Sequence, residues 1–574
     1  MRTAIIWSHF LVLLAHLGPT CADDTPQEPA LVVNRQDGQR DRFDLCPDYT
    51  NYAHHIHKPL SKGPLQLPFQ RPHPQCRLFS SPAVEKVIED LFPSFKDPDL
   101  AQIFRNAFPN TLDTTVLWHV DGVESHAQST HSVPTRAQWS GAQSFIVTGD
   151  INAEWLRDST NQLAQYQPLA KTAPEISRLL LGAINTQAEF VIASPYCNAF
   201  QPPDPSHLTP VPTGQEDIVH PAYEPSVVFE CKYELDSLAN FLSLSNQYYN
   251  STGSLEFITP RWYTALNAVL HVLNAQSQPT FNPGTGLYQR NEYTFSRSTR
   301  AGTETLNLDG IGNPLAAGTG LIRSAFRPSD DATTFGFLIP ANAFMSVELA
   351  RTANVLRAAA KDSKTIASDA EMINQVASDL DQRSEAIKAG IYEHAVFKHS
   401  KYGDVFAYEV DGYGSHLLMD DANVPSLLSL PMLGFVDASS EIYQNTRRMI
   451  LSRSNPYYLS GKKFSGIGGP HIGLRNAWPM SVLIQAVTST DDDEIMDCLN
   501  RVRDVSVLGL INESVDVIRG VKPGGDGMTR SWFAWANSVF AQTILSLIEK
   551  KPALILNTDE AGKRKYVLGQ GWTG

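Results

Sequence analysis

The sequence lacks most of the short motifs that point directly to a chemistry. Its 574 residues include only six cysteines and no CxxC pair, so the ligand spacing of a structural zinc site is missing. There is no HExxH, no GxSxG and no P-loop, and no GxGxxG occurs in a strand-to-helix setting. These absences remove the sequence signals of zinc peptidases, serine hydrolases and nucleotide-binding enzymes.

Positive charge is also in short supply. The chain has 46 Lys and Arg residues against 60 Asp and Glu, which gives a formal net charge of −14, and its sequence pI is near 5.6. A surface of this sign repels polyanions, so we expect no nucleic-acid partner. A neutral ligand is compatible with it.

Long apolar runs are absent beyond the N-terminus. Residues 1–22 begin with Arg2, continue as an apolar run and end in Cys21-Ala22 before acidic residues. This layout is typical of a signal peptide and is short for a membrane span, with a retained anchor as the alternative. We therefore expect a secreted protein, or a lumenal protein of the secretory pathway, with no membrane association after signal removal.

Loss of Cys21 with the signal leaves an odd number of cysteines, so at least one is free or pairs between chains. The five that remain are Cys46, Cys76, Cys197, Cys231 and Cys498. Cys46 and Cys76 bracket a proline-rich segment that a disulfide would hold in an oxidising compartment, and Cys197 with Cys231 is a second candidate pair. Two N-glycosylation sequons begin at Asn250 and Asn512.

Helical periodicity dominates from about residue 82. Residues 23–80 suit an extended N-terminal arm, residues 81–555 a helical domain, and residues 556–574 a C-terminal tail. Helices are predicted near 173–194, 232–249, 259–276, 340–360, 363–397, 438–452, 476–489, 491–504 and 530–549.

Long connections rich in Gly, Pro, Ser and Asp separate the predicted helices, as in 196–228, 277–329 and 453–475. Loops of this length in a compact domain are usually functional. The pattern predicts antiparallel helices whose loops gather on one side, as in an α-solenoid or a closed toroid. No repeat of 20–50 residues is present, which argues against the open solenoid.

Carboxylates, arginines and aromatic residues concentrate in four stretches at or before predicted helices. These are residues 149–162, 326–344, 411–434 with 466–481, and 511–540. Aromatic faces stack on sugar C–H surfaces, and Asp, Asn and Arg bind hydroxyl groups. Cleavage of a glycosidic bond then needs two carboxyl groups on opposite sides of the anomeric carbon.

Each of these residues taken alone also has a structural interpretation. Asp150 is a candidate helix cap, and the adjacent Asp330 and Asp331 suit the positive end of a helix. Glu513 alone would pass for a surface acid. His416, His471, Asp420 and Asp421 could bind a metal in principle, but no metal-ligand spacing supports this.

Six motifs in order carry a family resemblance. They are "GDINAEWLRDSTNQ", "VFECKYELDSL", "SAFRPSDDATTFGFLIPANAF", "MDDANVPSLLSLP", "GPHIGLRNAWPMS" and "TRSWFAWANSVF". Together they resemble glycoside hydrolase family 125 (GH125), the exo-acting α-mannosidases that remove α-1,6-linked mannose, and in particular its fungal secreted branch. The resemblance implies an all-α (α/α)6 toroid, an inverting mechanism, mannose-containing glycans as substrates, and neither metal nor cofactor.

The resemblance also implies roles for residues. The general acid is the aspartate of "RPSDD", either Asp330 or Asp331 with a lean to Asp330, and the general base is Glu513. Two departures from the family pattern are Asn512 in place of His and a longer turn after Glu513. A glycan on Asn512 would lie beside the base, so we expect this sequon to be unoccupied. Candidate sugar-binding residues are Asp150, Trp155, Arg157, Asp158, Arg327, His471, Trp478, Arg530 and Trp532.

Two other functions are compatible with the sequence. One is a different (α/α)6 glycosidase, similar to a glucoamylase or a trehalase. The other is a catalytically silent carbohydrate-binding protein, because the turn around Glu513 departs from the family pattern. The sequence does not determine the natural glycan or the oligomeric state.

Overall fold

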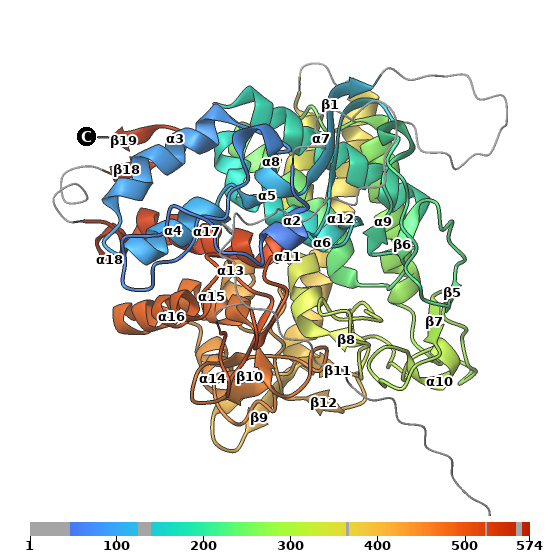
Figure 1. The fold of residues 1–574 in the computed structure, drawn as a ribbon. Coiled ribbons are helices and arrows are strands. Elements are labelled where there is room, and N and C mark those ends of the chain that lie inside the picture. The colour runs from blue at the N-terminus through green and yellow to red at the C-terminus, as the bar shows by residue number, and fades with distance from the viewer. Residues whose placement is uncertain (1–45, 124–138, 363–366, 523–524, 558–564, 574) are drawn as a thin grey trace, which may run out of the picture.

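The computed structural model describes residues 46–123, 139–362, 367–522, 525–557 and 565–573 (Figure 1). The predicted signal peptide lies outside these residues. Within them, none of the helices is long and apolar enough to span a bilayer.

Six helices form an inner ring in chain order. Helix α6 contacts α8, α8 contacts α11, and α11 contacts α13. Helix α15 contacts α17, and α17 contacts α6, so the last inner helix lies beside the first. Their bounds are α6 (Leu156–Leu163), α8 (Leu235–Thr252), α11 (Ile339–Ala360), α13 (Leu430–Leu433), α15 (Pro479–Val487) and α17 (Ala534–Lys550).

An outer helix follows each of the first five inner helices in the chain. These are α7 (Pro174–Ala193), α9 (Pro260–Gln276), α12 (Ala367–His394), α14 (Glu441–Ile450) and α16 (Asp492–Val505). A sixth, α4 (Pro98–Ala107), comes before the ring in sequence and packs on α17 and α16. The fold is therefore the predicted (α/α)6 toroid.

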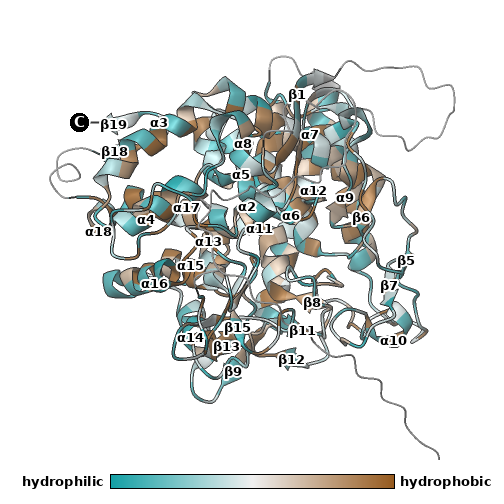
Figure 2. Cartoon of the chain, in the orientation of Figure 1, coloured by the Kyte–Doolittle hydropathy of each residue, from teal (hydrophilic) through white to brown (hydrophobic). Residues whose placement is uncertain are grey.

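Burial distinguishes the two layers. Every residue from Leu235 to Asn246 of α8 is buried, as is every residue from Ala534 to Ala541 of α17. The buried residues of α16 are Ile495, Cys498, Leu499, Val502 and Val505, which form one helical stripe. Figure 2 shows the opposite, hydrophilic side of α16 in teal. A helix buried on all sides belongs in a core, and an amphipathic helix covers one.

Three small antiparallel sheets connect the loops at the N-terminal ends of inner helices. Strand β3 ends directly before α6, and β8 ends directly before α11. One residue separates the end of β15 from the start of α15. The sheets are β3 (Glu154–Trp155), β4 (Ala199–Phe200) and β6 (Val228–Glu230); β8 (Phe337–Leu338), β11 (Glu409–Val410) and β12 (His416–Leu417); and β15 (Asn476–Ala477), β16 (Ser514–Asp516) and β17 (Met528–Thr529). Their loops are thereby fixed at one end of the ring.

The remaining elements are short. Five antiparallel pairs are β1 (Val116–Val123) with β2 (Gly141–Ile146), β5 (Asp217–His220) with β7 (Thr294–Arg297), β9 (Val396–His399) with β10 (Gly403–Phe406), β13 (Tyr458–Ser460) with β14 (Ser465–Ile467), and β18 (Lys565–Val567) with β19 (Gly571–Thr573). Short helices are α2 (Tyr49–Tyr52), α3 (Pro82–Leu91), α5 (Asn110–Thr114), α10 (Asn307–Gly310) and α18 (Pro552–Ile555).

The described part of the N-terminal arm packs on the first helices of the domain. Asn106 of α4 accepts a hydrogen bond from the Gln70 backbone and donates one to the Pro68 carbonyl, both at 2.9 Å. Arg71 lies 2.7 Å from Asp113 of α5. At the other end of the chain, the β18–β19 hairpin packs on α17 and α3, so the region expected as a tail contains ordered structure.

Both candidate disulfides are confirmed. Cys46 bonds to Cys76 and Cys197 bonds to Cys231. Cys498 is free and buried in α16. The odd cysteine of the sequence is therefore a core residue, which argues against its use in an intermolecular bond.

Candidate active site

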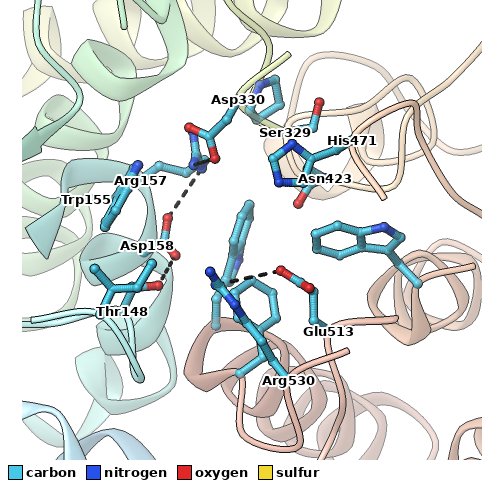
Figure 3. A pocket seen from close by; sticks show the side chains of 15 residues that line it. Thr148, Trp155, Arg157, Asp158, Ser329, Asp330, Asn423, His471, Glu513 and Arg530 are labelled. Carbon is cyan, nitrogen blue, oxygen red and sulfur yellow. Dashed lines mark hydrogen bonds and ion pairs between the residues drawn. The ribbon is translucent and has the colours of Figure 1, made fainter. Parts of the chain in front are cut away.

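One pocket lies at the end of the ring where the inner helices begin. It holds about 420 Å³ of open space, and most of its lining precedes or starts an inner helix. The lining residues are Thr148, Ile151, Trp155, Arg157, Asp158, Pro328, Ser329, Asp330, Asn423, His471, Trp478, Glu513, Arg530, Phe533 and Trp535 (Figure 3). Segments more than 350 residues apart in the chain thus share one site because their helices close into a ring.

A tight turn gives Asp330 and Asp331 opposite surroundings. The backbone NH of Asp330 donates to the Arg327 carbonyl, and Arg327 donates to the Asp331 carbonyl. Asp330 has a φ of 65°, in the left-handed region that aspartate tolerates better than most residues. Its side chain lines the pocket, whereas Asp331 is buried and does not.

The Asp331 carboxyl belongs to a buried polar network. Ser329 donates its hydroxyl toward Asp331 at 3.2 Å and toward Asp421 at 2.9 Å. Burial, together with the nearby Asp421 charge, raises the pKa of Asp331 to about 6. This residue is therefore placed to support the loop rather than to touch a ligand.

Cationic and amide groups surround Asp330. Asn198 donates to one of its carboxylate oxygens at 3.3 Å, and Arg157 Nη2 lies 3.8 Å from the other. Burial would raise the pKa of Asp330, but the charges of Lys232, Arg157 and His471 outweigh it and hold the pKa below its usual value. The Asp330 carboxylate is thus stabilised as an anion.

Glu234, directly before α8, contacts the same groups from behind. Its carboxyl accepts hydrogen bonds from Arg157 Nη1 at 2.5 Å, Ser237 at 2.8 Å and Asn198 at 3.3 Å. Burial raises the pKa of Glu234 well above its usual value, and the nearby Asp330 charge raises it further. Two carboxyl groups that share contacts in this way hold protons as a pair.

Glu513 enters the pocket from the other arc of the ring. It directly precedes β16, and Arg530 directly follows β17, so the β16–β17 pairing brings the two together. Arg530 Nη1 lies 3.6 Å from the Glu513 carboxylate, and Arg530 Nε lies 3.4 Å from Asp150. Figure 3 shows Asp330 and Glu513 on facing sides of the same space.

Aromatic rings form much of the remaining wall. Trp478 packs edge-on against Phe533, with ring centroids 5.8 Å apart, and the Arg157 guanidinium lies 5.4 Å from the Trp535 ring. The indole nitrogens of Trp155, Trp478 and Trp535 have no hydrogen-bond partner among the described residues. Indole NH groups usually find an acceptor when they are buried.

The structure therefore brings together Trp155, Arg157, Asp158, Asp330, His471, Trp478, Glu513 and Arg530 of the predicted site residues. Asp158 accepts a hydrogen bond from Thr148 at 2.5 Å. His471 lines the pocket with its Nδ1 at 4.0 Å from Asp331.

Four predicted residues lie behind or beside the lining, which corrects the expectation that they face a ligand. Asp331 is buried in the network described above. Arg327 is buried against Glu409 at 2.6 Å. Trp532 packs on Tyr49 and donates its indole NH to Asn110 at 3.0 Å. Asp150 reaches the site only through Arg530.

The helix-cap interpretations are also wrong, since the helices begin later. Helix α6 starts at Leu156, six residues after Asp150, and α11 starts at Ile339, eight residues after Asp331. Asn512 is fully buried and donates its side-chain amide to the Val505 carbonyl at 3.0 Å. The residue that departs from the family pattern therefore points away from the pocket.

Sequence reasoning missed several residues of the site. Asn423, Phe533 and Trp535 lie within the quoted motifs, but nothing in the motifs separates lining from supporting positions. Lys232 lies within the motif "VFECKYELDSL" and was not singled out there, whereas Asn198 lies outside all six motifs. Thr148, Ile151, Pro328 and Ser329 also line the pocket.

The metal alternative gains no support from the side-chain positions. His416 stacks on Phe397, and Asp420 accepts backbone hydrogen bonds from Leu427 and Leu428. Within the described residues, no group of three or more His, Cys, Asp and Glu side chains is arranged to hold a metal ion.

Comparisons with known proteins agree with this geometry. Residues 97–545 match the family described as metal-independent α-mannosidase (GH125). The chain is 51% identical over 512 residues to the meiotically up-regulated gene 157 protein of Schizosaccharomyces pombe, covering 89% of this chain and 94% of that protein.

A solved structure from Streptococcus pneumoniae is similar in fold and sequence. It is described as a metal-independent α-mannosidase in a non-productive complex with α-1,6-mannobiose, and it is 31% identical with a TM-score of 0.67. The match covers 82% of this chain and 98% of the bacterial chain. The family predicted from the six motifs is thus confirmed, and the chain belongs to GH125, the metal-independent α-mannosidases, a family of glycoside hydrolases.

Proposed function

We propose that this protein is an exo-acting, inverting α-mannosidase that removes terminal α-1,6-linked mannose from glycans. The observation that carries the proposal is the placement of Asp330 and Glu513 on facing sides of one pocket with tryptophan walls. Inverting hydrolysis needs two carboxyl groups about 6.5–9.5 Å apart, with room for a water between the base and the sugar. The mannobiose complex of the bacterial relative supports the α-1,6 linkage.

In this mechanism Asp330 donates a proton to the glycosidic oxygen while Glu513 takes a proton from the attacking water. The surrounding cations favour the Asp330 anion, so Asp330 acts as one member of a carboxyl pair that still holds a proton. Glu234 is the other member, because it shares Asn198 and Arg157 with Asp330 and its pKa is raised well above the usual value. The pair gives its proton to the leaving oxygen through Asp330, and the proton of the attacking water passes to Glu513. Arg157 contacts both carboxyl groups and keeps them in register.

Arg530 has a complementary task on the other side. Its guanidinium lies between Glu513 and Asp150, which fixes the Glu513 carboxylate at the wall of the pocket. The pocket tryptophans supply stacking faces and three indole NH groups that have no acceptor in the part of the chain that the structure describes. These are the groups that a neutral hexose with many hydroxyls can use.

The substrate test uses α-1,6-, α-1,3- and α-1,2-mannobiose with the purified protein in EDTA. We expect turnover of the first disaccharide alone, and NMR of the early product should show inverted anomeric configuration. Retention of configuration would contradict the mechanism. Loss of activity in EDTA that added metal restores would contradict metal independence.

The base is tested separately by Glu513→Gln. We expect a fall in kcat of about 10²–10⁴-fold, the usual contribution of general acid–base catalysis, with an unchanged circular dichroism spectrum. An unaltered kcat would exclude Glu513 as the base.

We further propose that the protein passes through the secretory pathway, supported by the signal-like N-terminus and the two disulfides. Asn250 is exposed near the end of α8, whereas Asn512 is fully buried. Mass spectrometry of the protein from its own source should find a glycan on Asn250 and none on Asn512. A glycan on Asn512 in active enzyme would contradict the placement of Glu513 beside it.

A further inference from the structure

Arg323 differs from every other buried arginine that the structure describes. The buried arginines within the described ranges are Arg71, Arg157, Arg323 and Arg327. Three of them have a carboxylate at 2.5–2.7 Å: Arg71 pairs with Asp113 and Glu85, Arg157 with Glu234, and Arg327 with Glu409. Among the described residues Arg323 has no such partner, even though the residue is only 6% exposed.

The contacts of the Arg323 guanidinium are few and uncharged. Its Nη2 donates to Thr280 Oγ1 at 3.5 Å, and its Nε and Nη1 have no hydrogen-bond partner among the described residues. The titratable groups that act on it are Tyr233, Tyr288 and Tyr196. Burial lowers the pKa of Arg323 only to about 10, so the group remains a cation at neutral pH.

Such a charge is costly without a counter-ion. Removing a guanidinium from water carries a penalty of several kcal/mol that only a paired anion offsets. A lysine or histidine in this position could escape by losing its proton, but arginine does not do so in proteins. An unpaired buried arginine therefore calls for an anion from outside the chain.

Arg323 lines a cavity that could hold this anion. The cavity has about 540 Å³ of open space and is lined by Ala275, Gln278, Pro279, Gln289, Arg290, Asn291, Glu292 and Arg323. It shares no lining residue with the pocket between Asp330 and Glu513. It is thus a separate site, formed by the C-terminal end of α9 and the loop that follows.

The other polar groups of the cavity suit an oxyanion. Arg290 is exposed and adds a second cation, and Asn291 contributes an amide group. Gln278 and Gln289 each donate one amide NH to a backbone carbonyl, Asn274 and Pro279, and keep a second NH for a ligand. The acid in the lining, Glu292, lies 3.2 Å from His271 Nε2, so its charge has a partner of its own when that histidine is protonated.

We propose that this cavity is a binding site for a tetrahedral oxyanion, phosphate or a phosphate group carried on a larger molecule, with Arg323 as its main contact. A guanidinium keeps its charge when it is buried and binds oxyanions through strong charge-assisted hydrogen bonds. Nε and Nη1 of Arg323 are covered by the chain, so Arg323 acts on the anion through its charge and through Nη2, whose one contact is the 3.5 Å bond to Thr280.

The first test measures binding to the full-length wild-type protein. Calorimetry and thermal denaturation are followed against inorganic phosphate, glucose 6-phosphate and glucose, each at an ionic strength matched with sodium chloride. We expect a saturable rise in Tm with both phosphates and none with glucose. A phosphate effect no larger than that of chloride, or an equal effect of glucose, would overturn the proposal. Preference for glucose 6-phosphate over free phosphate would identify a carried phosphate group as the ligand.

The second test uses variants. Arg323→Met keeps the aliphatic stem and removes the charge, and the loss of one charge-assisted contact should weaken phosphate binding about ten- to hundredfold. Arg290→Met, at the exposed rim, should weaken it less and folds without a change in the core. Arg453→Met is the matched control, since Arg453 is an exposed residue of a different hollow.

Stability provides an independent reading. In buffer without oxyanions, Arg323→Met should be at least as stable as wild type, because it removes an uncompensated buried charge. Added phosphate should raise the free energy of unfolding of wild type more than that of the variant. Full phosphate binding by Arg323→Met would overturn the proposal. If Arg323→Met fails to fold, unchanged binding by Arg290→Met together with a chloride-like response of wild type would overturn it equally.

Discussion

The wall of the active-site pocket and the layer directly behind it use the same residue types for different purposes. Asp330 lines the pocket and Asp331, the next residue, is buried in a polar network. Arg157 faces the pocket, whereas Arg327 is closed off against Glu409. The comparison shows that residue type and motif membership do not assign a role here; the direction of the side chain does.

The physical origin of this difference is local backbone geometry. Asp330 adopts a positive φ within a turn closed by Arg327. This backbone geometry directs the carboxyl groups of Asp330 and Asp331 into different environments. Behind the wall, Arg327 is paired with Glu409 and Asp331 accepts a hydrogen bond from Ser329. In the wall, Asp330 and Glu513 keep part of their surface open to a ligand.

The largest expected effect comes from Asp330→Asn. Removal of the acid should lower kcat on mannobiose by about 10²–10⁴-fold. The loss should be much smaller on an aryl mannoside with an acidic phenol, because that leaving group departs without protonation. Steady-state kinetics on both substrates measure the difference.

Asp331→Asn is the matched control for this experiment. Its activity should change far less, and by the same factor on both substrates, because Asp331 does not reach the glycosidic oxygen. If Asp331→Asn rather than Asp330→Asn showed the dependence on the leaving group, the assignment of the two aspartates would be reversed.

Glu234→Gln sharpens the account of how Asp330 obtains its proton. The glutamine cannot hold a proton, so the pair loses the carboxyl group whose pKa is raised well above its usual value, while Lys232, Arg157 and His471 still hold the pKa of Asp330 below its usual value. The basic limb of the kcat/KM profile should therefore shift to lower pH, by about one unit or more, with a roughly tenfold loss on that limb. The profile should be measured from pH 4 to 8, with Ser237→Ala as a control that removes another contact of Glu234 and retains its carboxyl. An unmoved basic limb would show that Glu234 only positions Arg157.

The helical toroid could be predicted from sequence because its signals are local and repeated. Apolar periodicity identified most of the inner and outer helices, including α7, α8, α9, α11 and α12, within a few residues of their ends. The two disulfides were candidate pairs in the sequence, which left the pairing of the five cysteines open, and the structure has both of them. The small sheets were missed, since strands of two or three residues carry too little pattern to detect.

The site was predicted at the level of segments but not of side-chain directions. Every quoted motif reaches the end of the ring that holds the pocket, yet Trp532 faces Asn110 while Trp535, three residues later, lines the wall. One helical turn from a loop into α17 separates the two. The role of Asn198 depends on packing between distant segments, and no local pattern encodes that.

The stability of Asp331→Asn should differ from wild type in a pH-dependent way. The folded-state pKa of Asp331 is raised to about 6, so the folded protein binds this proton more tightly than the unfolded chain does. Wild-type stability from this group is present below about pH 4 and is lost as pH rises through 6, by up to about 3 kcal/mol. Asn cannot titrate, so the free energy of unfolding of the variant, relative to that of wild type, should rise between pH 4 and pH 7. Urea denaturation at both values measures the gain, and a pH-independent difference would contradict the buried placement.

The smallest expected effect is that of Trp532→Phe. The change removes the indole NH that Asn110 accepts at 3.0 Å and leaves a buried amide oxygen without this donor, at a cost of about 1–3 kcal/mol in folding free energy. Because Trp532 lies behind the wall, KM and kcat should stay unchanged while Tm falls. Trp535→Phe is the control from the wall, because it deletes an indole NH without a protein acceptor and should raise KM with less effect on Tm. A higher KM for Trp532→Phe would mean that Trp532 contacts the sugar. The distinction between residues that line the pocket and residues behind them would then be wrong for this pair of tryptophans.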